Sequence, residues 1–251
     1  TPAHAWVPGS SAGPLGRRVD VTLQTAFHSA LAAELESASA SPPTYAEIVH
    51  LARRLVFSRQ PDEAVQGSRR VLNSLFPNWP PNPTRDGRRG LLYWFDVLFI
   101  RNAPGFSAKL NAWITALAGV WLMGPCELQD LDADADLVQI GDGRRQQLLV
   151  QRCRFLEEAK CASVCVNGCK LPTEAFFSGD MRLPVSIEPD YETLECRFKF
   201  GVAPTEAGAA AARDVACFAA CPAAAADKAV VQQLRSSYRS SAASDRCMDQ
   251  P

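Results

Sequence analysis

Nine cysteines are the residues with the clearest potential for chemistry in this 251-residue sequence. Seven of them lie between residues 153 and 221. Two groups repeat at every fourth position: Cys161, Cys165 and Cys169, and then Cys217 and Cys221. This spacing places thiols on one face of a helix, about 6 Å apart along its axis. Such neighbours suit two ligands of one metal centre, whereas their Cβ directions suit a disulfide poorly.

The first cysteine group requires a break in its helix if all three thiols are to meet. A straight helix over residues 155–170 would hold Cys161 and Cys169 about 12 Å apart, which is too far for one compact centre. The pair Asn167-Gly168 can adopt the left-handed geometry that ends a helix. We therefore expect the helix to end there and to turn Cys169 back, with Leu171-Pro172 preventing any long continuation.

Three explanations of the cysteines stay open. Clustered thiols with only three histidines in the chain are typical of iron–sulfur or zinc sites. Zinc sites usually have two-residue spacing, so the pattern favours iron–sulfur. Disulfides would need distant partners and would leave one thiol over. Burial as small hydrophobic side chains is the third explanation, and it suits Cys126 best.

The predicted metal ligands come from both cysteine groups and from one strand between them. They outnumber the thiolates that hold a single iron–sulfur cluster, so the pattern does not decide which of them bind. The candidates are Cys161, Cys165, Cys169, Cys196, Cys217 and Cys221.

Composition and charge exclude several classes of protein. Hydrophobic residues make up 47% and charged residues 21%, which is ordinary for a soluble globular protein. The net charge of −1 lacks the basic excess that nucleic-acid binding requires. No charged residue lies between Lys109 and Glu127, but this stretch is shorter than the about 20 residues of a membrane span. It predicts a core helix, or one that lines an apolar pocket or touches a membrane, so we expect at most peripheral membrane contact.

The hydrophobic pattern predicts helices in the first half of the chain. Apolar residues recur at helical spacing over residues 44–57, 61–76, 91–100 and 106–123. Thr44 and Glu47 form a capping box at the first of these helices. Gly124-Pro125 ends the last one, and an Ala-rich helix is expected from about residue 205 to residue 221.

The pattern changes to strands in the second half. Residues 137–140 and 148–150 flank Gly141-Asp142-Gly143 and predict a hairpin. Residues 194–202 alternate strictly and place Cys196 on one buried face with Phe198 and Phe200. The predicted fold class is α+β, with a helical N-terminal part packed on a cysteine-rich C-terminal part that contains a small antiparallel sheet.

Segment boundaries follow from composition. Residues 1–20, acid-poor before Asp20, resemble a flexible leader or the remnant of a transit peptide. Prolines between residues 77 and 83 suggest a boundary between a helical subdomain (21–83) and the cysteine-rich region (84–235). Residues 236–251 are Ser-rich without periodic apolar positions, so we expect a disordered tail.

Four stretches resemble the plastid β-carotene isomerase family, whose dwarf-mutant member acts at the start of strigolactone biosynthesis. They are WLMGPCEL (121–128), CRFLEEAKCASVCVNGCKLPTEAFF (153–177), LPVSIEPDYETLECRFKFGVAP (183–204) and CFAACP (217–222). The likeness extends from about residue 44 to residue 222. The Ala-rich segment before Cys217, the Ser-rich tail and the Gly-Asp-Gly loop depart from the family.

The resemblance implies an iron-containing chloroplast protein that interconverts all-trans-β-carotene, or a related carotenoid, and its 9-cis isomer. It also implies a carotenoid substrate and suggests a downstream carotenoid cleavage enzyme as a partner. It transfers no catalytic residue. A valence-changing iron centre, unlike zinc, could borrow one electron from the polyene and return it, which would let a double bond rotate.

Candidate substrate-contacting and catalytic residues follow from the apolar helices and from the residues after them. A carotenoid needs a long apolar slot. Glu127 could tune the iron site or act as an acid, although a capping or surface role would explain it equally well. The aromatic candidates for the pocket lining are Trp94, Phe95, Phe99, Trp113 and Trp121. The principal alternative function is a non-catalytic cysteine-rich scaffold with structural zinc or disulfides.

Overall fold

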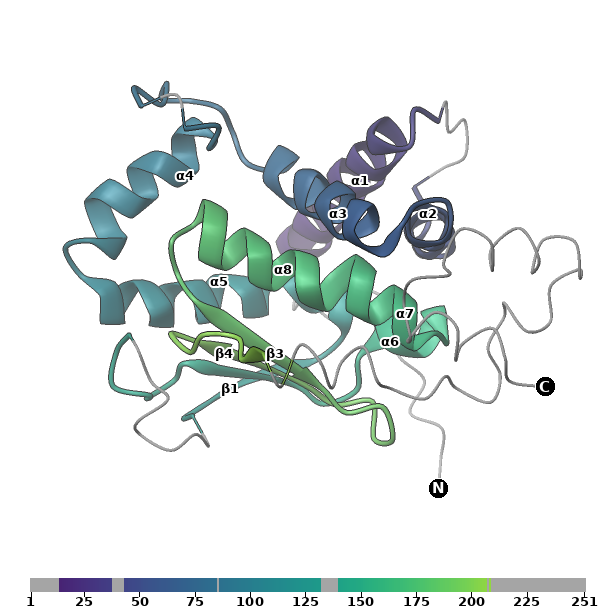
Figure 1. The fold of residues 1–251 in the computed structure, drawn as a ribbon. Helices are drawn as coiled ribbons and strands as arrows, with labels where there is room; N and C mark the ends of the chain where they lie inside the picture. The colour runs from purple at the N-terminus through teal and green to yellow at the C-terminus, as the bar shows by residue number, and fades with distance from the viewer. Residues whose placement is uncertain (1–13, 38–42, 85, 132–139, 207, 209–251) are drawn as a thin grey trace, which may run out of the picture.

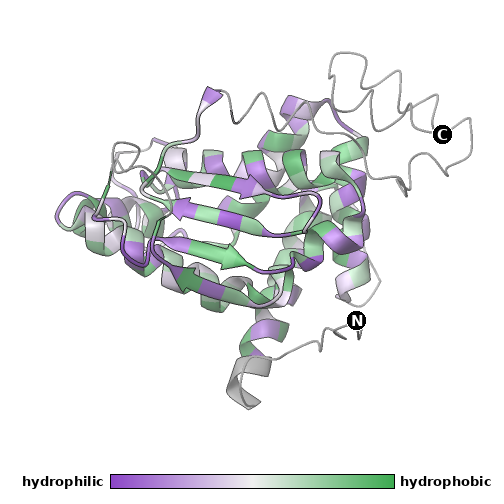
Figure 2. Ribbon diagram, turned by 90° about the horizontal axis from the view of Figure 1, so that it is seen from below, coloured by the Kyte–Doolittle hydropathy of each residue, from purple (hydrophilic) through white to green (hydrophobic). Residues whose placement is uncertain are grey.

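The computed structural model describes residues 14–37, 43–84, 86–131, 140–206 and 208. It confirms the α+β class, because helices pack on a four-stranded antiparallel sheet with the order β1-β2-β4-β3. Figure 1 shows the labelled helices above the sheet, and Figure 2 shows the strands from the opposite side with the helices behind them. The helices therefore cover one face of the sheet.

The N-terminal helices form their own layer, farther from the sheet. They are α1 (Pro14–Glu34), α2 (Tyr45–Phe57) and α3 (Pro61–Ser74). The predicted cap at Thr44 is confirmed, since its hydroxyl accepts a hydrogen bond of 3.2 Å from the Glu47 amide. Buried side chains of α1, α2 and α3, with Trp121, make a small core of their own. The helix α1 begins at Pro14, within the segment predicted as a leader.

A second helical unit follows the proline-rich loop. It consists of α4 (Gly90–Phe95), the π-helical turn η1 (Asp96–Ile100) and α5 (Pro104–Met123). The carboxylate of Asp96 is buried and ion-paired with Arg88 at 2.9 Å and with Arg101 at 3.0 Å. Helix α5 ends at Gly124 as predicted, where φ is +95°, a conformation that favours glycine. One face of α5 contacts the sheet.

Successive residues along the strands point alternately to the face of the sheet that the helices cover and to the open face. Its strands are β1 (Cys126–Gln129), β2 (Gln147–Val150), β3 (Val185–Pro189) and β4 (Cys196–Phe200). On β4, Cys196, Phe198 and Phe200 are buried and the residues between them are not, which confirms the predicted face. Residues 137–139 of the predicted hairpin lie outside the described residues. The neighbours of β2 are β1 and β4 at every position, so the predicted pairing with 137–140 is wrong.

The helix that carries the first cysteine group differs from the prediction. The chain breaks after α6 (Arg154–Ala159), where Lys160 adopts a left-handed conformation with φ of 48°. It then continues through α7 (Ala162–Cys165), η3 (Val166–Lys170), α8 (Leu171–Ala175) and η4 (Phe176–Asp180). We call residues 162–180 the long helix.

The predicted stop at Asn167-Gly168 is wrong because wide turns carry the long helix past Pro172. Gly168 is not among the residues with positive φ. The amide of Leu171 donates to the carbonyl of Val166, five residues back, rather than to the usual fourth. Such π turns relieve the clash that a proline makes with a regular α-helical turn. The N-terminal helices α2 and α3 contact the long helix and cover it.

Candidate thiol site

Four cysteines from different elements lie near enough to one another for their charges to interact. They form the thiol cluster: Cys153, Cys165, Cys169 and Cys196. Burial is the main cause that raises the pKa of these thiols, to about 12 for Cys169. Negative charge on Cys153 would raise the pKa of each of the other three further. Burial therefore favours the protonated, uncharged form of these thiols.

Local structure explains why these four cysteines meet. Cys153 is the N-cap of α6, and its amide donates to the carbonyl of Leu194 at 2.7 Å. This bond ties the start of α6 to the residues just before β4. Cys196 is opposite Val150 in the sheet, on the face that the helices cover. Cys165 and Cys169 are one helical turn apart on the long helix, as their spacing predicted.

A tyrosine completes the surroundings of the cluster. The buried hydroxyl of Tyr191 lies close to the side chain of Cys165. Burial first, and then the charges of Cys165 and Cys196, raise the pKa of Tyr191 well above its usual range. Sequence reasoning missed Tyr191 and did not include Cys153 in the ligand set. Neither residue belongs to a four-residue repeat, so only the fold brings them to the site.

A buried ion pair fixes the long helix beside the cluster. The Nζ of Lys170 lies 2.6 Å from the Oε1 of Glu174 and donates to the carbonyl of Ile187 at 2.6 Å. The same carboxylate oxygen accepts from the Ile187 amide at 2.8 Å. Both side chains are buried, so these bonds attach the long helix to β3. The positive charge of Lys170 lowers the pKa of Cys165, Cys169 and Cys196, against the larger effect of burial.

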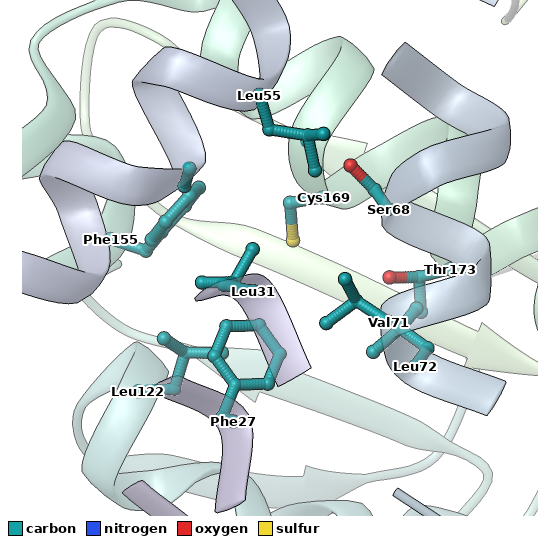
Figure 3. A pocket seen from close by; sticks show the side chains of 12 residues that line it. Phe27, Leu31, Leu55, Ser68, Val71, Leu72, Leu122, Phe155, Cys169 and Thr173 are labelled. Carbon is teal, nitrogen blue, oxygen red and sulfur yellow. The ribbon is translucent and has the colours of Figure 1, made fainter. Parts of the chain in front are cut away.

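An apolar cavity lies on the other side of Cys169. Its volume is about 50 Å³. In Figure 3 the sulfur of Cys169 points into the cavity, among side chains that come from separate helices. Thr173 lies beside Cys169 in this lining, and its hydroxyl lowers the pKa of the Cys169 thiol, against the larger effect of burial. The lining residues are Phe27, Leu31, Ala52, Leu55, Ser68, Val71, Leu72, Leu122, Phe155, Gly168, Cys169 and Thr173.

The cavity has the right character for an apolar ligand but a small volume. Sites for small molecules usually have volumes of about 300–1,000 Å³. The cavity as it stands is therefore too small to hold a long polyene. Ser68 and Thr173 supply the cavity's only side-chain hydroxyls among the lining residues, so the wall offers little to a polar ligand.

The six predicted metal ligands are only partly brought together. Cys165, Cys169 and Cys196 belong to the thiol cluster, whereas Cys161 is fully buried at the N-cap of α7, in extended backbone. Cys217 and Cys221 lie outside the described residues, as does most of the predicted Ala-rich helix. Among the residues that the structure describes, no three His, Cys, Asp or Glu side chains are arranged to hold a metal ion. The ligand set stays a prediction.

None of the other predicted site residues in the described chain is among those that line the cavity. Phe99 and Trp113 are 40% and 50% exposed on η1 and α5. Trp121 is buried, with its ring 5.8 Å from the Phe27 ring of the cavity wall. The side chains of Trp94 and Phe95 are half-buried on α4, and Phe95 stacks on Phe99. Their contact with substrate stays a prediction.

Glu127 lies on β1 and is exposed. Its partner in the sheet is Leu149, and the next strand places Arg197 at the same level. These positions alternate with those of Leu148 and Val150, which are fully buried under the helices. Glu127 is therefore on the open face of the sheet, opposite to the thiol cluster, and its proposed catalytic role stays a prediction.

Comparison with known proteins finds a family match over the segment that carries the thiol cluster. Residues 121–209 match the family described as "Beta-carotene isomerase D27-like, C-terminal". All four thiols of the cluster lie inside this segment, and Cys217 and Cys221 lie beyond it. The resemblance to the plastid β-carotene isomerase family is thereby confirmed.

Two curated relatives agree with this family. The chain is 30% identical over 115 residues to "Beta-carotene isomerase D27, chloroplastic" of Arabidopsis thaliana, covering 46% of this chain and 41% of that protein. It is 31% identical over 111 residues to the protein of the same name from Medicago truncatula, covering 43% and 41%. The match thus spans about two fifths of the length of these relatives. No solved structure matches the chain.

Proposed function

We propose that this protein is a plastid carotenoid cis–trans isomerase that depends on iron. The substrate would be all-trans-β-carotene or a related carotenoid, and the product its 9-cis isomer. One observation carries the proposal: the segment that matches the isomerase family contains a cluster of four thiols, of which three are buried and the fourth, Cys169, borders an apolar cavity. The names of the two relatives support both the reaction and the plastid location.

The reaction demands an environment of the kind that these residues provide. Isomerisation of one double bond consumes no atoms and no electrons, so the site must bind the polyene, weaken one bond and return to its starting state. A carotene offers no hydrogen-bonding group, and the cavity wall is made mainly of aliphatic and aromatic side chains. Such a wall suits an apolar ligand.

The proposal includes iron because of the chemistry of the cysteine side chains. Thiols are the ligands that iron–sulfur centres use. The described residues alone do not complete such a site, so we assign no step to iron. The remaining ligands would be Cys217 and Cys221, which share the four-residue spacing of Cys165 and Cys169. A downstream carotenoid cleavage enzyme that takes up the product remains a prediction.

The proposal is tested by assaying the purified protein after anaerobic iron loading. All-trans carotenoids are supplied in detergent, and the products are resolved by chromatography. We expect a 9-cis product from at least one carotenoid. Replacement of Cys165 by serine should remove both bound iron and activity. The matched control is Cys126→Ser, because Cys126 is outside the predicted ligand set and contacts the Gly124 carbonyl at 3.1 Å. The Cys126→Ser variant should keep both its bound iron and its activity.

Three outcomes contradict the proposal. Iron-loaded wild-type protein that isomerises none of the carotenoids would exclude the reaction. Activity in iron-free protein would exclude the dependence on iron. Colourless, inactive protein that binds zinc stoichiometrically, or that has no free thiols, would instead favour the non-catalytic scaffold. Circular dichroism of each variant shows whether a loss of activity reflects unfolding.

A further inference from the structure

A second hollow in the molecule is open and polar, in contrast to the apolar cavity beside Cys169. It lies where α1, α3, the loop before α4 and the end of η4 meet (Figure 1), and its volume is about 660 Å³. Sites for small molecules usually have volumes of about 300–1,000 Å³. We call this hollow the arginine groove, because three arginines line it, namely Arg69, Arg70 and Arg89.

Ion pairs already occupy both carboxylates of the arginine groove. Asp180 accepts hydrogen bonds from the Nε of Arg69 at 2.7 Å and from its Nη2 at 3.0 Å. Glu34 accepts from the Nε of Arg70 at 3.1 Å and from its Nη2 at 2.6 Å. Glu34 also accepts from the guanidinium group of Arg59. Every carboxylate oxygen of the groove therefore has an arginine partner.

Hydrogen-bond donors remain in the groove after these pairs have formed. Within the described part of the chain, the guanidinium group of Arg89 has no ion pair and no hydrogen bond. The Nη1 groups of Arg69 and Arg70 likewise have no partner among the described residues. The side chains of Gln66 and Asn73 make no hydrogen bond to these residues either. Because arginine donates but cannot accept, the unused hydrogen-bonding capacity of the wall is mainly that of donors.

The charge of the arginine groove stays positive when the ion pairs are counted. Three arginines and two carboxylates line it, which leaves one positive charge. An adjoining groove contains two arginines and two acids, Asp62 and Glu63, so its charges balance. The charge without a partner therefore belongs to Arg89, on the loop before α4.

We propose that the arginine groove binds a small phosphorylated molecule, whose phosphate contacts Arg89 and the Nη1 groups of Arg69 and Arg70. A phosphate group presents three acceptor oxygens and a negative charge, and the guanidinium group matches its geometry. A carboxylate presents only two oxygens to the three guanidinium groups, so it fits less well. The volume of the groove leaves room for an organic part of the ligand beside the phosphate.

A soluble molecule and a lipid headgroup could both supply such a phosphate. None of the helices in the described part of the chain is long and apolar enough to span a membrane. The wall of the groove itself has only three aliphatic residues, Ala30, Ala33 and Val71. Acyl chains would find little to contact on this wall, so we assign the groove to a soluble phosphate ester.

This inference does not depend on the proposed isomerase activity. The arginine groove and the apolar cavity share one lining residue, Val71. A carotene has no hydrogen-bond acceptor, so it could use none of the donors in the groove. The experiment below measures binding alone and requires neither iron nor carotenoid. Its failure would leave the proposed function intact, and a failure of the isomerase assay would leave the groove intact.

Isothermal titration calorimetry of the full chain tests the proposal with inorganic phosphate, glycerol 3-phosphate and succinate. Each probe is added up to about 10 mM, which detects millimolar dissociation constants. We expect both phosphates to bind, and glycerol 3-phosphate to bind more tightly than succinate. Arg89→Gln should weaken the binding of glycerol 3-phosphate about tenfold, because it removes a charge-assisted contact. Arg89→Lys keeps the charge but loses the planar fork, so the loss should be about threefold.

The matched control is Arg53→Gln. Arg53 is also a half-buried arginine, but it lies on α2, outside the arginine groove. The Arg53→Gln variant should bind glycerol 3-phosphate as the wild type does. The Arg89 side chain does not cap α4, so its variants should fold, and circular dichroism verifies this for each protein.

Four calorimetric results would overturn the proposal. They are a wild type that binds neither phosphate, an Arg89→Gln variant that binds like the wild type, an Arg53→Gln variant that loses as much binding as Arg89→Gln, and succinate that binds as tightly as glycerol 3-phosphate. Flotation with vesicles of phosphatidylcholine and phosphatidic acid tests the lipid source. We expect no flotation, and wild-type protein that floats but binds neither soluble phosphate would assign the groove to a lipid headgroup.

Discussion

The helix α5 and the long helix pack on the same face of the sheet but have opposite surroundings. The long helix is covered by α2 and α3, and it buries polar side chains such as Asn167, Lys170 and Glu174. Helix α5 contains only one charged residue, Lys109, yet it exposes Trp113 and Leu117. The more polar helix is thus the more deeply buried of the two. The burial of a helix therefore depends more on which neighbours pack against it than on its own composition.

The two helices also differ in how their polar groups are satisfied. Asn167 donates to the hydroxyl of Ser163 at 3.1 Å, and Lys170 bonds to Glu174 and to Ile187. Burial of a polar group is costly unless a partner is present, so these bonds make the position of the long helix specific. The apolar contacts of α5 are less directional and would tolerate a second partner.

Loss of the buried ion pair should give one of the two largest losses of stability. Lys170→Met leaves the Glu174 carboxylate buried without its cation, and we expect the free energy of unfolding to fall by about 3–5 kcal/mol. Urea denaturation followed by circular dichroism measures it. The control is Arg152→Gln, which removes an exposed ion pair to Glu157 and should cost at most about 1 kcal/mol. Equal losses in the two variants would contradict the assigned role of Lys170.

Two phenylalanines, one buried on the long helix and one exposed on α5, test the difference between the two helices. Phe176 is 3% exposed at the end of the long helix and stacks on Phe76, with ring centres 5.2 Å apart. Phe106 is 55% exposed on α5. We expect Phe176→Ala to lower the free energy of unfolding by about 3–5 kcal/mol, and Phe106→Ala by less than about 0.5 kcal/mol. A large loss at Phe106, measured by the same denaturation, would show that this end of α5 is covered in the free protein.

The smallest expected loss of stability concerns helix α2, which covers part of the long helix. Thr44→Ala removes the side-chain cap of α2 and should cost about 1 kcal/mol. Thr44→Ser keeps a hydroxyl and serves as the control, with a loss near zero. Thermal unfolding of both variants measures the difference. If Thr44→Ala were as stable as Thr44→Ser, the capping bond would contribute nothing to α2.

Several parts of the fold could be predicted because they depend on nearby residues. The cap at Thr44, the end of α5 at Gly124 and the buried face of β4 all follow from short patterns, and all are confirmed. The course of the long helix could not be predicted in this way. Asn167-Gly168 and Pro172 are local signals for an end, but packing against α2 and α3 outweighs them, and π turns accommodate the proline.

In the candidate site, too, the local features could be predicted from the sequence and the others could not. Four-residue spacing correctly places Cys165 and Cys169 on neighbouring turns, because helical periodicity is a local property. It could not reveal Cys153 or Tyr191, which approach them only after the strands pair. Nor could it show that Glu127 lies on the open face of the sheet, since that face is decided by which side the helices cover.

The sequence by itself determined the resemblance to the family, the α+β class, most helix positions and the thiols that could do chemistry, because periodicity, caps and motifs depend on neighbouring residues. The tertiary structure alone decided which thiols meet, that the Lys170 and Glu174 pair is buried beside them, and that half of an apolar helix is left exposed. These features join residues far apart in the chain, and their energies depend on burial, which no local pattern specifies.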